Sequence, residues 1–417
     1  MDEEHDVSYK QDSPMPCYDA REVAIERARR NPTKLIFGSA TPSMRTWKKC
    51  VFDKKLRLLR MKDRISSTEI PEIKIVDMRD EFKQGNTKIF CSELLDLISQ
   101  LKAKKEQAII LIPRRGYNGF LSCRNCGFII NCPNCDVPLS VHLGSKGKQW
   151  LSCHWCDHKS RIINSCPDCN SSAFKPFGIG TQRVIEFLNS EFPKLRVLRF
   201  DRDTTSGKDG HRKILSKFFK GDADILVGTQ MLAKGIDIPN VTLSVVIAAD
   251  GLLHRPDISA EEKSLQLFLQ LAGRAGRAKK LGKVIFQTYK PIHPVISYLK
   301  NRDYEGFLIE SSKLRKEAKL YPFCKVCLLK LSGEDYDCTE LTAIKLAKYL
   351  LSCCQEKQWK VIGPAPSLIS KLGKKFRWQI LIHGPENSEI PLPDRQLLWK
   401  LIPKNVFLTI DLNPVEL

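Results

Sequence analysis

Eight cysteines within the segment 123–169 fall into four pairs of the form Cys-x2-Cys. The pairs are Cys123/Cys126, Cys132/Cys135, Cys153/Cys156 and Cys166/Cys169. Two residues between thiolates allow both sulfurs to reach one tetrahedral zinc ion through a tight turn, and the turn-forming residues Gly127, Pro133 and Pro167 accompany the pairs. Eight thiolates suffice for two four-cysteine sites, which leave no coordination position for a reacting water. Two structural zinc ions per chain are therefore expected.

The spacing of the pairs indicates how they combine. The second and third pairs are separated by 17 residues, within the range of roughly 15 to 20 that is typical of a zinc ribbon. Segments 138–143 and 149–152 between them are expected to form a hairpin. An inner zinc is therefore predicted to bind Cys132, Cys135, Cys153 and Cys156, and an outer zinc to bind Cys123, Cys126, Cys166 and Cys169. His154 and His158 could be substitute ligands, and the plain alternative is a core of reduced cysteines.

Composition limits the class of protein. The chain has 417 residues, 42% of them hydrophobic, which is enough for two to four folded domains. Lys and Arg number 68 against 47 Asp and Glu, and the resulting net charge of +21 favours a polyanionic partner, nucleic acid before a membrane surface. No segment approaches the ~18 apolar residues of a spanning helix, and the acidic start does not fit a signal peptide. A cytoplasmic protein without a membrane partner is expected, with its thiols kept reduced.

Outside the cysteine segment, short apolar strands alternate with amphipathic helices, which is typical of a parallel α/β sheet. Strands are predicted at residues 34–37, 108–112, 195–200, 224–227, 242–249 and 283–287. Helices are predicted at residues 92–104, 184–192 and 264–272. The cysteine segment interrupts this pattern and is therefore an insertion, and an α+β C-terminal domain is expected after residue 290. A further pair, Cys324/Cys327, lies in a predicted strand and has no second pair nearby.

Four short polar motifs occur in a suggestive order. Residues 2–5 read Asp-Glu-Glu-His, and residues 38–41 read Gly-Ser-Ala-Thr after a predicted strand. Residues 228–235 read Gly-Thr-Gln-Met-Leu-Ala-Lys-Gly, and residues 270–277 read Gln-Leu-Ala-Gly-Arg-Ala-Gly-Arg. Their order and spacing are similar to motifs II, III, V and VI of superfamily 2 helicases. This similarity implies a RecA-like helicase lobe that uses ATP and Mg²⁺.

Phosphoryl transfer gives each motif residue an expected role. Asp2 would hold Mg²⁺ through water, Glu3 would orient and deprotonate the attacking water, and His5 would couple this acidic box to its neighbours. Arg274 and Arg277 would stabilise charge on the γ-phosphate as arginine fingers, although paired arginines also contact nucleic-acid backbones. The residues expected to couple ATP to lobe closure are Ser39, Thr41 and Gln270. Those expected to line the groove for a DNA strand are Thr229, Gln230 and Lys234.

A helicase lobe interrupted by two four-cysteine zinc sites resembles the primosomal protein N′ (PriA) family of bacterial replication-restart helicases. The resemblance runs from residue 2 to the C-terminus. The matching segments are 2–6, 8–11, 38–42, 114–116, 201–205, 228–235, 270–277 and 377–381. The resemblance implies ATP-dependent 3′-to-5′ unwinding at stalled forks, in the cytoplasm at the nucleoid. It also implies partners, namely forked and single-stranded DNA, single-stranded-DNA-binding protein and other primosome proteins.

Two contact sites follow from the same resemblance. In the family, an aromatic-rich loop after the acidic box couples DNA binding to ATP hydrolysis, and Tyr9 and Tyr18 occupy that loop here. Lys375 and Gln379, beside Trp378, align with the family's pocket for the acidic tail of single-stranded-DNA-binding protein. A basic, partly aromatic surface strand is the plain alternative for this last pair.

The sequence departs from the family pattern in one large respect. It contains no P-loop, Gly-x4-Gly-Lys-Ser/Thr, whose backbone amides and lysine cradle the triphosphate. That motif is expected upstream of Asp2, so the chain is expected to be the C-terminal portion of such a helicase, from a split gene, a misassigned start or an expressed fragment. It is expected to lack ATPase activity alone. Ile236 also stands where the family usually has a histidine.

The expected domains follow the motifs. They are a truncated helicase lobe 1 at residues 1–105, lobe 2 at 106–122 and 174–290, the zinc domain at 123–173 and the C-terminal domain at 291–417. Three hypotheses remain open. The chain is part of a restart helicase whose P-loop half is supplied elsewhere, a catalytically inactive zinc-dependent module that binds DNA or primosome proteins, or the product of a decaying gene.

Overall fold

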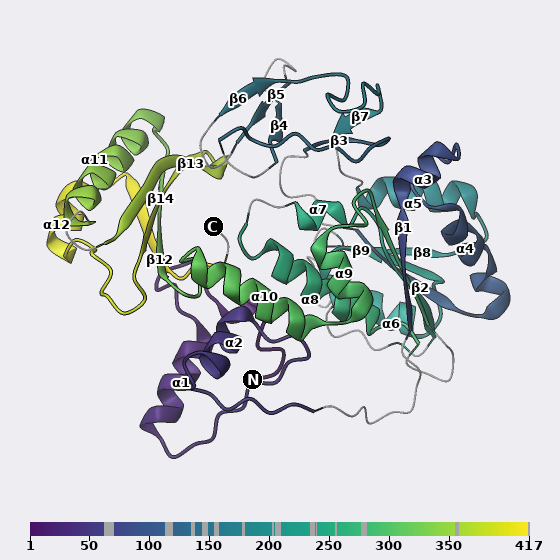
Figure 1. Cartoon of the computed structure of the whole chain (residues 1–417), viewed down its shortest axis with the longest axis horizontal. Helices are drawn as coiled ribbons and strands as arrows, with labels where there is room; N and C mark the ends of the chain where they lie inside the picture. Colours follow the sequence, from purple (N-terminus) through teal and green to yellow (C-terminus); the bar gives the residue numbers. More distant parts are fainter. Residues whose placement is uncertain are drawn as a thin grey trace.

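The computed structural model consists of a parallel α/β sheet, a cysteine-rich module and an antiparallel C-terminal domain, with an N-terminal segment packed between the first and the last (Figure 1). It describes residues 1–61, 71–112, 120–134, 138–143, 149–153, 158–176, 180–201, 204, 210–233, 238, 240–254, 257–276, 282–354 and 358–415. Within these residues, no helix combines the length and apolar character needed to cross a membrane.

The central element is a six-stranded sheet in the order β1-β11-β10-β2-β9-β8, with every pairing parallel. Its strands are β1 (Glu72–Asp77), β2 (Gln107–Leu111), β8 (Val197–Phe200), β9 (Ile225–Gly228), β10 (Val241–Val246) and β11 (Lys283–Thr288). All residues of β2, β9 and β10 are buried, because helices cover both faces of the sheet. The predicted parallel α/β class is therefore confirmed.

Two layers of helices enclose this sheet. One layer contains α3 (Met78–Lys83), α4 (Ser92–Lys104) and α5 (Thr181–Glu191). The other contains α6 (Gly210–Phe219), the short 3-10 helix η2 (Gln230–Ala233), α7 (Asp250–Leu253), α8 (Ala260–Ala272), α9 (Pro294–Asn301) and α10 (Tyr304–Glu317). Alternate residues of β2 enter the two cores: Ile109 and Leu111 face the second layer, and Ala108 and Ile110 face the first.

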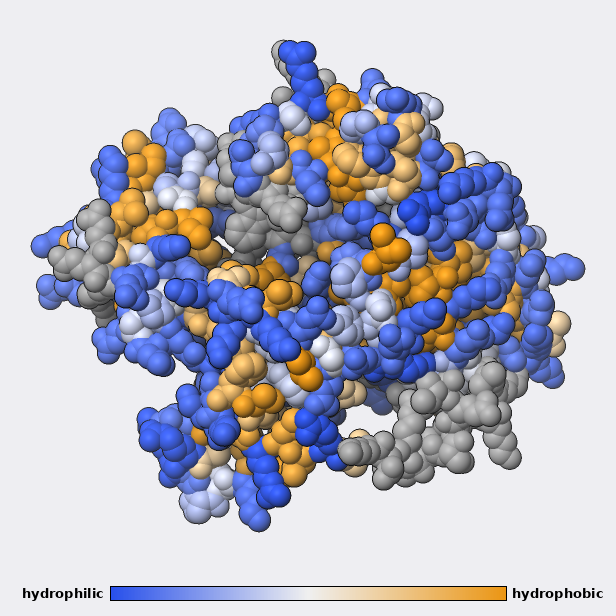
Figure 2. Space-filling model, in the orientation of Figure 1, coloured by the Kyte–Doolittle hydropathy of each residue, from blue (hydrophilic) through white to orange (hydrophobic). Residues whose placement is uncertain are grey.

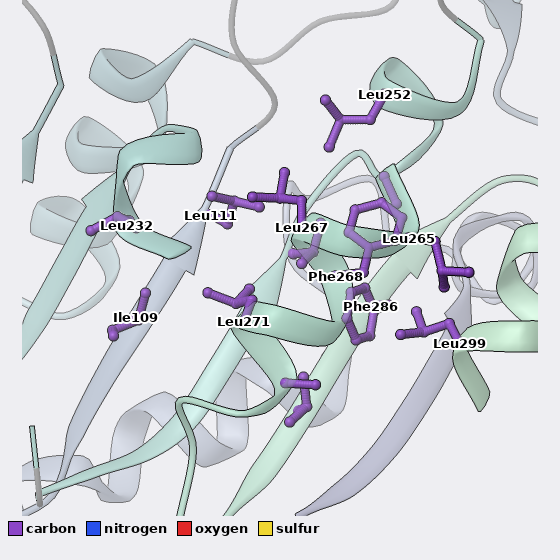
Figure 3. Packing of buried hydrophobic residues seen from close by; sticks show 14 of the residues in the cluster. Ile109, Leu111, Leu232, Leu252, Leu265, Leu267, Phe268, Leu271, Phe286 and Leu299 are labelled. Carbon is purple, nitrogen blue, oxygen red and sulfur yellow. The ribbon is translucent and has the colours of Figure 1, made fainter. Parts of the chain in front are cut away.

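Helix α8 lies in the middle of the second layer. Figure 3 shows Leu265, Phe268 and Leu271 of this helix pointing toward the sheet, where Phe268 meets Phe286 of β11 edge to face at 5.2 Å. Nine of its thirteen residues are buried, including Glu262 and Gln266. A helix buried on nearly all sides needs partners for its polar side chains, and these partners come from the N-terminal segment.

Two sequence expectations differ from the structure. Residues 72–104 were assigned to lobe 1, but β1 pairs with β11 along its whole length and α4 packs into the core of the same sheet. The assignment failed because β1, Glu-Ile-Lys-Ile-Val-Asp, is a short edge strand whose charged residues hide its apolar alternation. The predicted strand at 34–37 is wrong. Within the described ranges, the backbone of residues 34–37 is hydrogen-bonded to Met1 alone, whose N donates to the Ile36 carbonyl at 2.7 Å, and Ile36 is 76% exposed.

The N-terminal segment contains the 3-10 helix η1 (Val7–Tyr9) and helices α1 (Ala20–Arg30) and α2 (Met44–Val51). Helix α2 contributes Met44 and Trp47 to the core beside α8. Several apolar side chains on this segment remain exposed, and Figure 2 shows orange apolar residues among blue charged ones there. The exposed apolar residues include Val7, Met15, Val23, Ile36, Val51, Phe52, Leu59 and Met61.

The C-terminal domain is the predicted α+β unit. Its antiparallel sheet has the order β13-β14-β12-β15, formed by β12 (Lys325–Gly333), β13 (Lys360–Leu372), β14 (Lys375–Gly384) and β15 (Val406–Leu412). Helices α11 (Tyr336–Cys354) and α12 (Arg395–Leu401) pack on one face. Cys324 directly precedes β12 and Cys327 lies within it. Burial raises the pKa of each thiol to about 12, so both remain protonated.

The cysteine-rich module consists of two small sheets. Strand β3 (Leu121–Cys123) pairs antiparallel with β7 (Phe174–Pro176), which brings the two ends of the insertion together. Between them, β4 (Ser140–Leu143), β5 (Gln149–Ser152) and β6 (Lys159–Arg161) form a three-stranded antiparallel sheet. The predicted hairpin and the predicted insertion are thus both confirmed.

Candidate functional site

Four cysteine sulfurs converge at the base of the module. The Sγ atoms of Cys123, Cys126, Cys166 and Cys169 all lie within 4.8 Å of one another, and the Cys123–Cys169 and Cys126–Cys166 pairs are 3.6 Å apart. Tetrahedral zinc with Zn–S bonds of about 2.3 Å needs sulfurs about 3.8 Å apart. The soft donor set and these separations fit zinc, and the grouping is the one expected for the outer site.

The two Cys-x2-Cys pairs of this centre lie on two backbone turns of the same kind. Gly127 N donates to the Cys123 carbonyl at 3.0 Å, and Asn170 N donates to the Cys166 carbonyl at 2.9 Å. Both residues have a left-handed backbone, with φ of 79° for Gly127 and 55° for Asn170, conformations that Gly and Asn adopt at low cost. The sequence thus places a turn-forming residue directly after the second cysteine of each pair, and the turn aims both sulfurs at one point.

Burial and hydrogen bonding shift the thiols of this centre in opposite directions. Burial raises the pKa of the Cys123 thiol and of the Cys126 thiol. At Cys169, the backbone N–H of Ser171 and the Asn125 amide lower the thiol pKa to about 7. A bound zinc ion would stabilise the thiolates that burial disfavours.

The inner set is described in part. Cys132 and Cys153 are both buried and belong to the same apolar cluster as the outer cysteines. Cys135, Cys156 and His154 lie outside the described residues. The backbone carbonyl of His158 accepts from Cys153 N at 2.9 Å, which closes the turn before β6.

The acidic box at residues 2–5 is hydrogen-bonded to the motif at residues 38–41. Glu4 N donates to the Gly38 carbonyl at 3.1 Å, and Gly38 N donates to the Met1 carbonyl at 2.9 Å. The Asp2 carboxylate accepts from Glu3 N at 3.0 Å. Glu3 has a left-handed backbone, with φ of 44°, and its Oε2 lies 3.5 Å from His5 Nδ1 without forming a hydrogen bond.

His5 connects three of the four motifs. Its Nδ1 is 2.7 Å from Ser39 Oγ, and its Nε2 is 2.8 Å from Gln270 Nε2. With the Gln270 amide nitrogen donating, His5 Nε2 accepts, and a neutral ring carries its proton on Nδ1 and donates it to Ser39. Ser39 Oγ also accepts from Thr41 N at 3.0 Å. The imidazole therefore joins the acidic box, the 38–41 motif and the end of α8.

Helix α8 extends this contact along one edge. Gln266, one turn before Gln270, donates to the Thr41 carbonyl at 3.3 Å and to the Tyr304 hydroxyl at 2.9 Å. One turn earlier still, Glu262 accepts from Met44 N at 2.8 Å. Residues four apart share one helix face, so the three polar side chains form a single seam against residues 5–44. The sequence signal was present as polar residues every fourth position in an apolar helix, but only Gln270 was predicted.

Glu4 is a third residue of this site, after Glu262 and Gln266, that was not predicted from the sequence. Its carboxylate is 1% exposed and accepts from Ser43 N at 2.6 Å, from Ser43 Oγ at 3.1 Å and from Thr46 Oγ1 at 2.7 Å. Burial raises its pKa, while these hydrogen bonds oppose the rise. Glu4 therefore satisfies the N-terminus of α2 and fixes the acidic box to that helix.

The remaining nucleotide-site and DNA-site predictions are placed as follows. Arg274 is half-buried just after α8, whereas Arg277 and Lys234 lie outside the described residues. Thr229 is buried at the end of β9, and Gln230 begins η2. Tyr9 donates its hydroxyl to the Asp2 carbonyl at 2.8 Å, and Tyr18 is 47% exposed. Tyr9 thus supports the acidic box, while Tyr18 is free to meet a ligand.

Lys375 and Gln379 lie on the outer face of the C-terminal sheet. Along β14 the buried residues alternate with half-buried ones, and Trp378 is among the buried set. Trp378 therefore belongs to the core beneath, with its ring near Tyr336 at 6.1 Å, and cannot share a surface with its two neighbours. Lys375 Nζ instead lies 4.1 Å from the ring centroid of Phe407, and Gln379 is in register with Lys330. The outer face is basic and partly aromatic.

Comparison with known proteins agrees with this architecture. Family models match residues 132–161 as the PriA DNA helicase Cys-rich region domain, 152–279 as the helicase conserved C-terminal domain, and 316–415 as the primosomal protein N C-terminal domain. The chain is 42% identical to replication restart protein PriA of Synechocystis over 421 residues, covering 100% of this chain and 50% of that relative. Against PriA of Bacillus subtilis the identity is 40%, covering 99% of this chain and 51% of the relative.

The parallel sheet, the seam on α8 and the match to the helicase C-terminal domain define a helicase lobe carrying a cysteine-rich insertion. The chain spans about half the length of the curated relatives it matches. Two of the three family models are PriA domains, and the similarity to replication restart protein PriA extends along the whole chain, so the chain is similar throughout its length to about half of a PriA protein.

Proposed function

We propose that the chain forms the ATP-sensing and DNA-contacting part of a replication-restart helicase that unwinds forked DNA in the 3′-to-5′ direction. The single observation that carries this proposal is the His5 contact with Ser39 and Gln270. A histidine that touches three helicase motifs at once can transmit the state of a nucleotide to the packing of α8. Asp2 and Glu3 would hold Mg²⁺ and the attacking water, and Arg274 with Arg277 would face the γ-phosphate.

The chain's sequence supplies no P-loop, so ATP turnover needs a second half that carries one. The exposed apolar residues of the N-terminal segment, Ile36, Leu59 and Met61 among them, support a surface for that half. Two zinc ions would hold the cysteine module, and a net charge of +21 suits single-stranded and forked DNA at the nucleoid. Single-stranded-DNA-binding protein, through its acidic tail at Lys375 and Gln379, and other primosome proteins are the proposed protein partners.

The test compares ATP hydrolysis by the purified chain alone with hydrolysis after a P-loop-bearing half from a relative is added. We expect no DNA-stimulated hydrolysis from the chain alone and measurable hydrolysis from the mixture. The His5→Ala chain should lower the rate of the mixture at least tenfold, because the contact between motifs is lost. Hydrolysis by the chain alone, or a mixture indifferent to His5, would contradict the proposal.

A second candidate function is a DNA- or primosome-binding module without catalysis. It is favoured by the outer zinc centre and the basic outer face of the C-terminal sheet, neither of which needs a nucleotide. The two functions separate in one measurement: fork-DNA binding that ADP and ATP leave unchanged, even with the P-loop half present, would support the binding module.

A further inference from the structure

A buried ion pair links the N-terminal segment to the last strand of the C-terminal domain. Lys10 Nζ lies 2.7 Å from Asp411 Oδ1, and the two side chains are only 2% and 1% exposed. Lys10 Nζ also donates to the Cys17 carbonyl at 3.0 Å. On the other side, Lys330 Nζ of β12 lies 3.5 Å from Asp411 Oδ2. Residues far apart in sequence thus share one desolvated cluster of two cations and one anion.

The ion pair sits at the base of a closed loop. An isolated bridge between Lys10 and Asp19 closes residues 10–19, and Gln11 N donates to the Tyr18 carbonyl at 2.9 Å. Inside the loop, Gln11 Nε2 donates to the carbonyls of Pro14 and Pro16 at 2.7 and 3.0 Å. The loop is therefore a small ordered unit that can move or dock as one body.

This loop lies against the edge of the C-terminal sheet. Strand β15 is the terminal strand of its sheet, and Cys17 forms an isolated parallel bridge with Asp411. One residue earlier on β15, Ile410 N donates to Met15 Sδ at 3.3 Å. These backbone contacts are few and weak compared with a full strand pairing. The Lys10–Asp411 ion pair is the buried charge contact of this docking, and its two groups are within ion-pair distance without hydrogen-bond geometry.

The other end of the loop reaches the acidic box. Tyr9, the residue before Lys10, donates its hydroxyl to the Asp2 carbonyl at 2.8 Å. Lys10 N in turn donates to the Val7 carbonyl at 3.0 Å, which completes the turn of η1 that Asp6 caps. A displacement of Lys10 would move Tyr9 and, through it, the backbone of Asp2.

We propose that Lys10 and Asp411 form a latch through which the C-terminal sheet positions the loop 10–19 and, beyond it, the acidic box. Removing either member of a buried ion pair leaves the other charge buried and uncompensated. The loss of either residue should therefore destabilise the docked position of the loop. When the C-terminal domain binds or releases a partner, the latch conveys the change to residues 2–9. This coupling does not depend on whether the chain is a helicase.

Amide hydrogen exchange of the full chain, followed by mass spectrometry, tests the latch. In the Lys10→Met chain and in the Asp411→Asn chain, we expect residues 11–18 to exchange at least tenfold faster than in the wild type, and residues 2–6 to follow by a smaller factor. Lys371→Met is the matched control, because Lys371 is an exposed cation on β13, at the opposite edge of the sheet. In the Lys371→Met chain, the amides of residues 11–18 should exchange at the wild-type rate.

The double variant Lys10→Met/Asp411→Asn decides whether the two residues act together. If they form one latch, its loop exchanges no faster than that of the faster single variant. Multiplicative acceleration in the double variant would overturn the proposal, as would unchanged exchange in Lys10→Met. The Lys10 variant stays informative even if Asp411→Asn loosens β12 and α11, because Lys10 lies outside the C-terminal domain and leaves Asp411 with Lys330.

Discussion

The outer zinc centre and the His5 contact are built in opposite ways. All four cysteines of the zinc centre come from one segment of 47 residues, and two repeated backbone turns aim their sulfurs. The His5 contact instead joins residues 5, 39 and 270, which meet only when the N-terminal segment packs on α8. One site carries its geometry in local spacing, whereas the other depends on the tertiary fold.

This contrast has a physical consequence for stability. A metal centre concentrates its stabilising free energy in a few coordinate bonds, so it resists change until a ligand is lost. The His5 contact and the rest of the seam on α8 instead consist of single hydrogen bonds, each worth about 1 kcal/mol. The first site should fail as a unit and the second by degrees.

The largest expected effect is the loss of a zinc ligand. In a Cys166→Ser chain the outer centre should release its metal, and zinc content should fall by one ion per chain. Structural zinc supplies roughly 10 to 16 kcal/mol in small domains, so β3 and β7 should become protease-sensitive. Cys353→Ser, near the C-terminus of α11, is the control and should retain the wild-type zinc content. If the seam on α8 also lost its exchange protection, the view that the zinc centre depends only on its own segment would be wrong.

The next effect tests the other region through Glu4. Glu4→Leu removes a buried carboxylate and leaves Ser43 N and the Thr46 hydroxyl without their acceptor, at a cost of about 3 kcal/mol. Glu4→Gln keeps one acceptor oxygen and should cost less than half as much. Denaturant unfolding gives both values, with exposed Glu26 as the control site. Equal losses for Leu and Gln would mean that size, not hydrogen bonding, explains the burial of Glu4.

A third prediction concerns the junction of the zinc module and the sheet. The His254 ring contacts Phe120 at the base of the module and His293 beside it, at centroid distances of 5.7 and 5.8 Å. Burial lowers the pKa of His254 to about 3 and that of His293 to about 4. Since the unfolded imidazoles bind protons below about pH 6.5, stability should be full above that pH and decline as pH falls toward 4.

The expected loss at pH 5 is up to about 2 kcal/mol for each imidazole. Because acid also releases zinc from thiolates, the informative quantity is the difference between variants. His254→Phe keeps a ring against Phe120 and should lose about 2 kcal/mol less than the wild type between pH 7.5 and pH 5, as measured by thermal unfolding. The exposed His211 gives the control, His211→Gln, which should follow the wild type. A His254→Phe chain as acid-sensitive as the wild type would rule out this origin.

Features whose geometry depends on residues close together in sequence were predicted, and features that depend on distant residues were predicted less well. The hairpin of β4 and β5, the insertion and the grouping of Cys123 with Cys166 all follow from spacing, because a Cys-x2-Cys turn has one geometry wherever it occurs. Motif order likewise placed His5, Ser39 and Gln270 in one site. Glu4, Glu262 and Gln266 were not predicted, because their partners lie far away in sequence and meet them only in the folded chain, although the four-residue spacing of the polar side chains on α8 was visible. Trp378 was placed beside Lys375 and Gln379, although strand alternation turns it inward.

The smallest effect divides the His5 contact itself. His5→Ala and Gln270→Ala each remove the same hydrogen bond, and His5→Ala also removes the bond to Ser39. Gln270→Ala should therefore cost about 1 kcal/mol and His5→Ala about 2 kcal/mol. Because the two variants share one bond, the double variant should cost about 2 kcal/mol rather than 3. Local exchange of the amides at residues 39–41 reports these values, and Thr339→Ala in α11 should leave them unchanged. Strict additivity would show that His5 and Gln270 act separately, and the contact would then join two motifs instead of three.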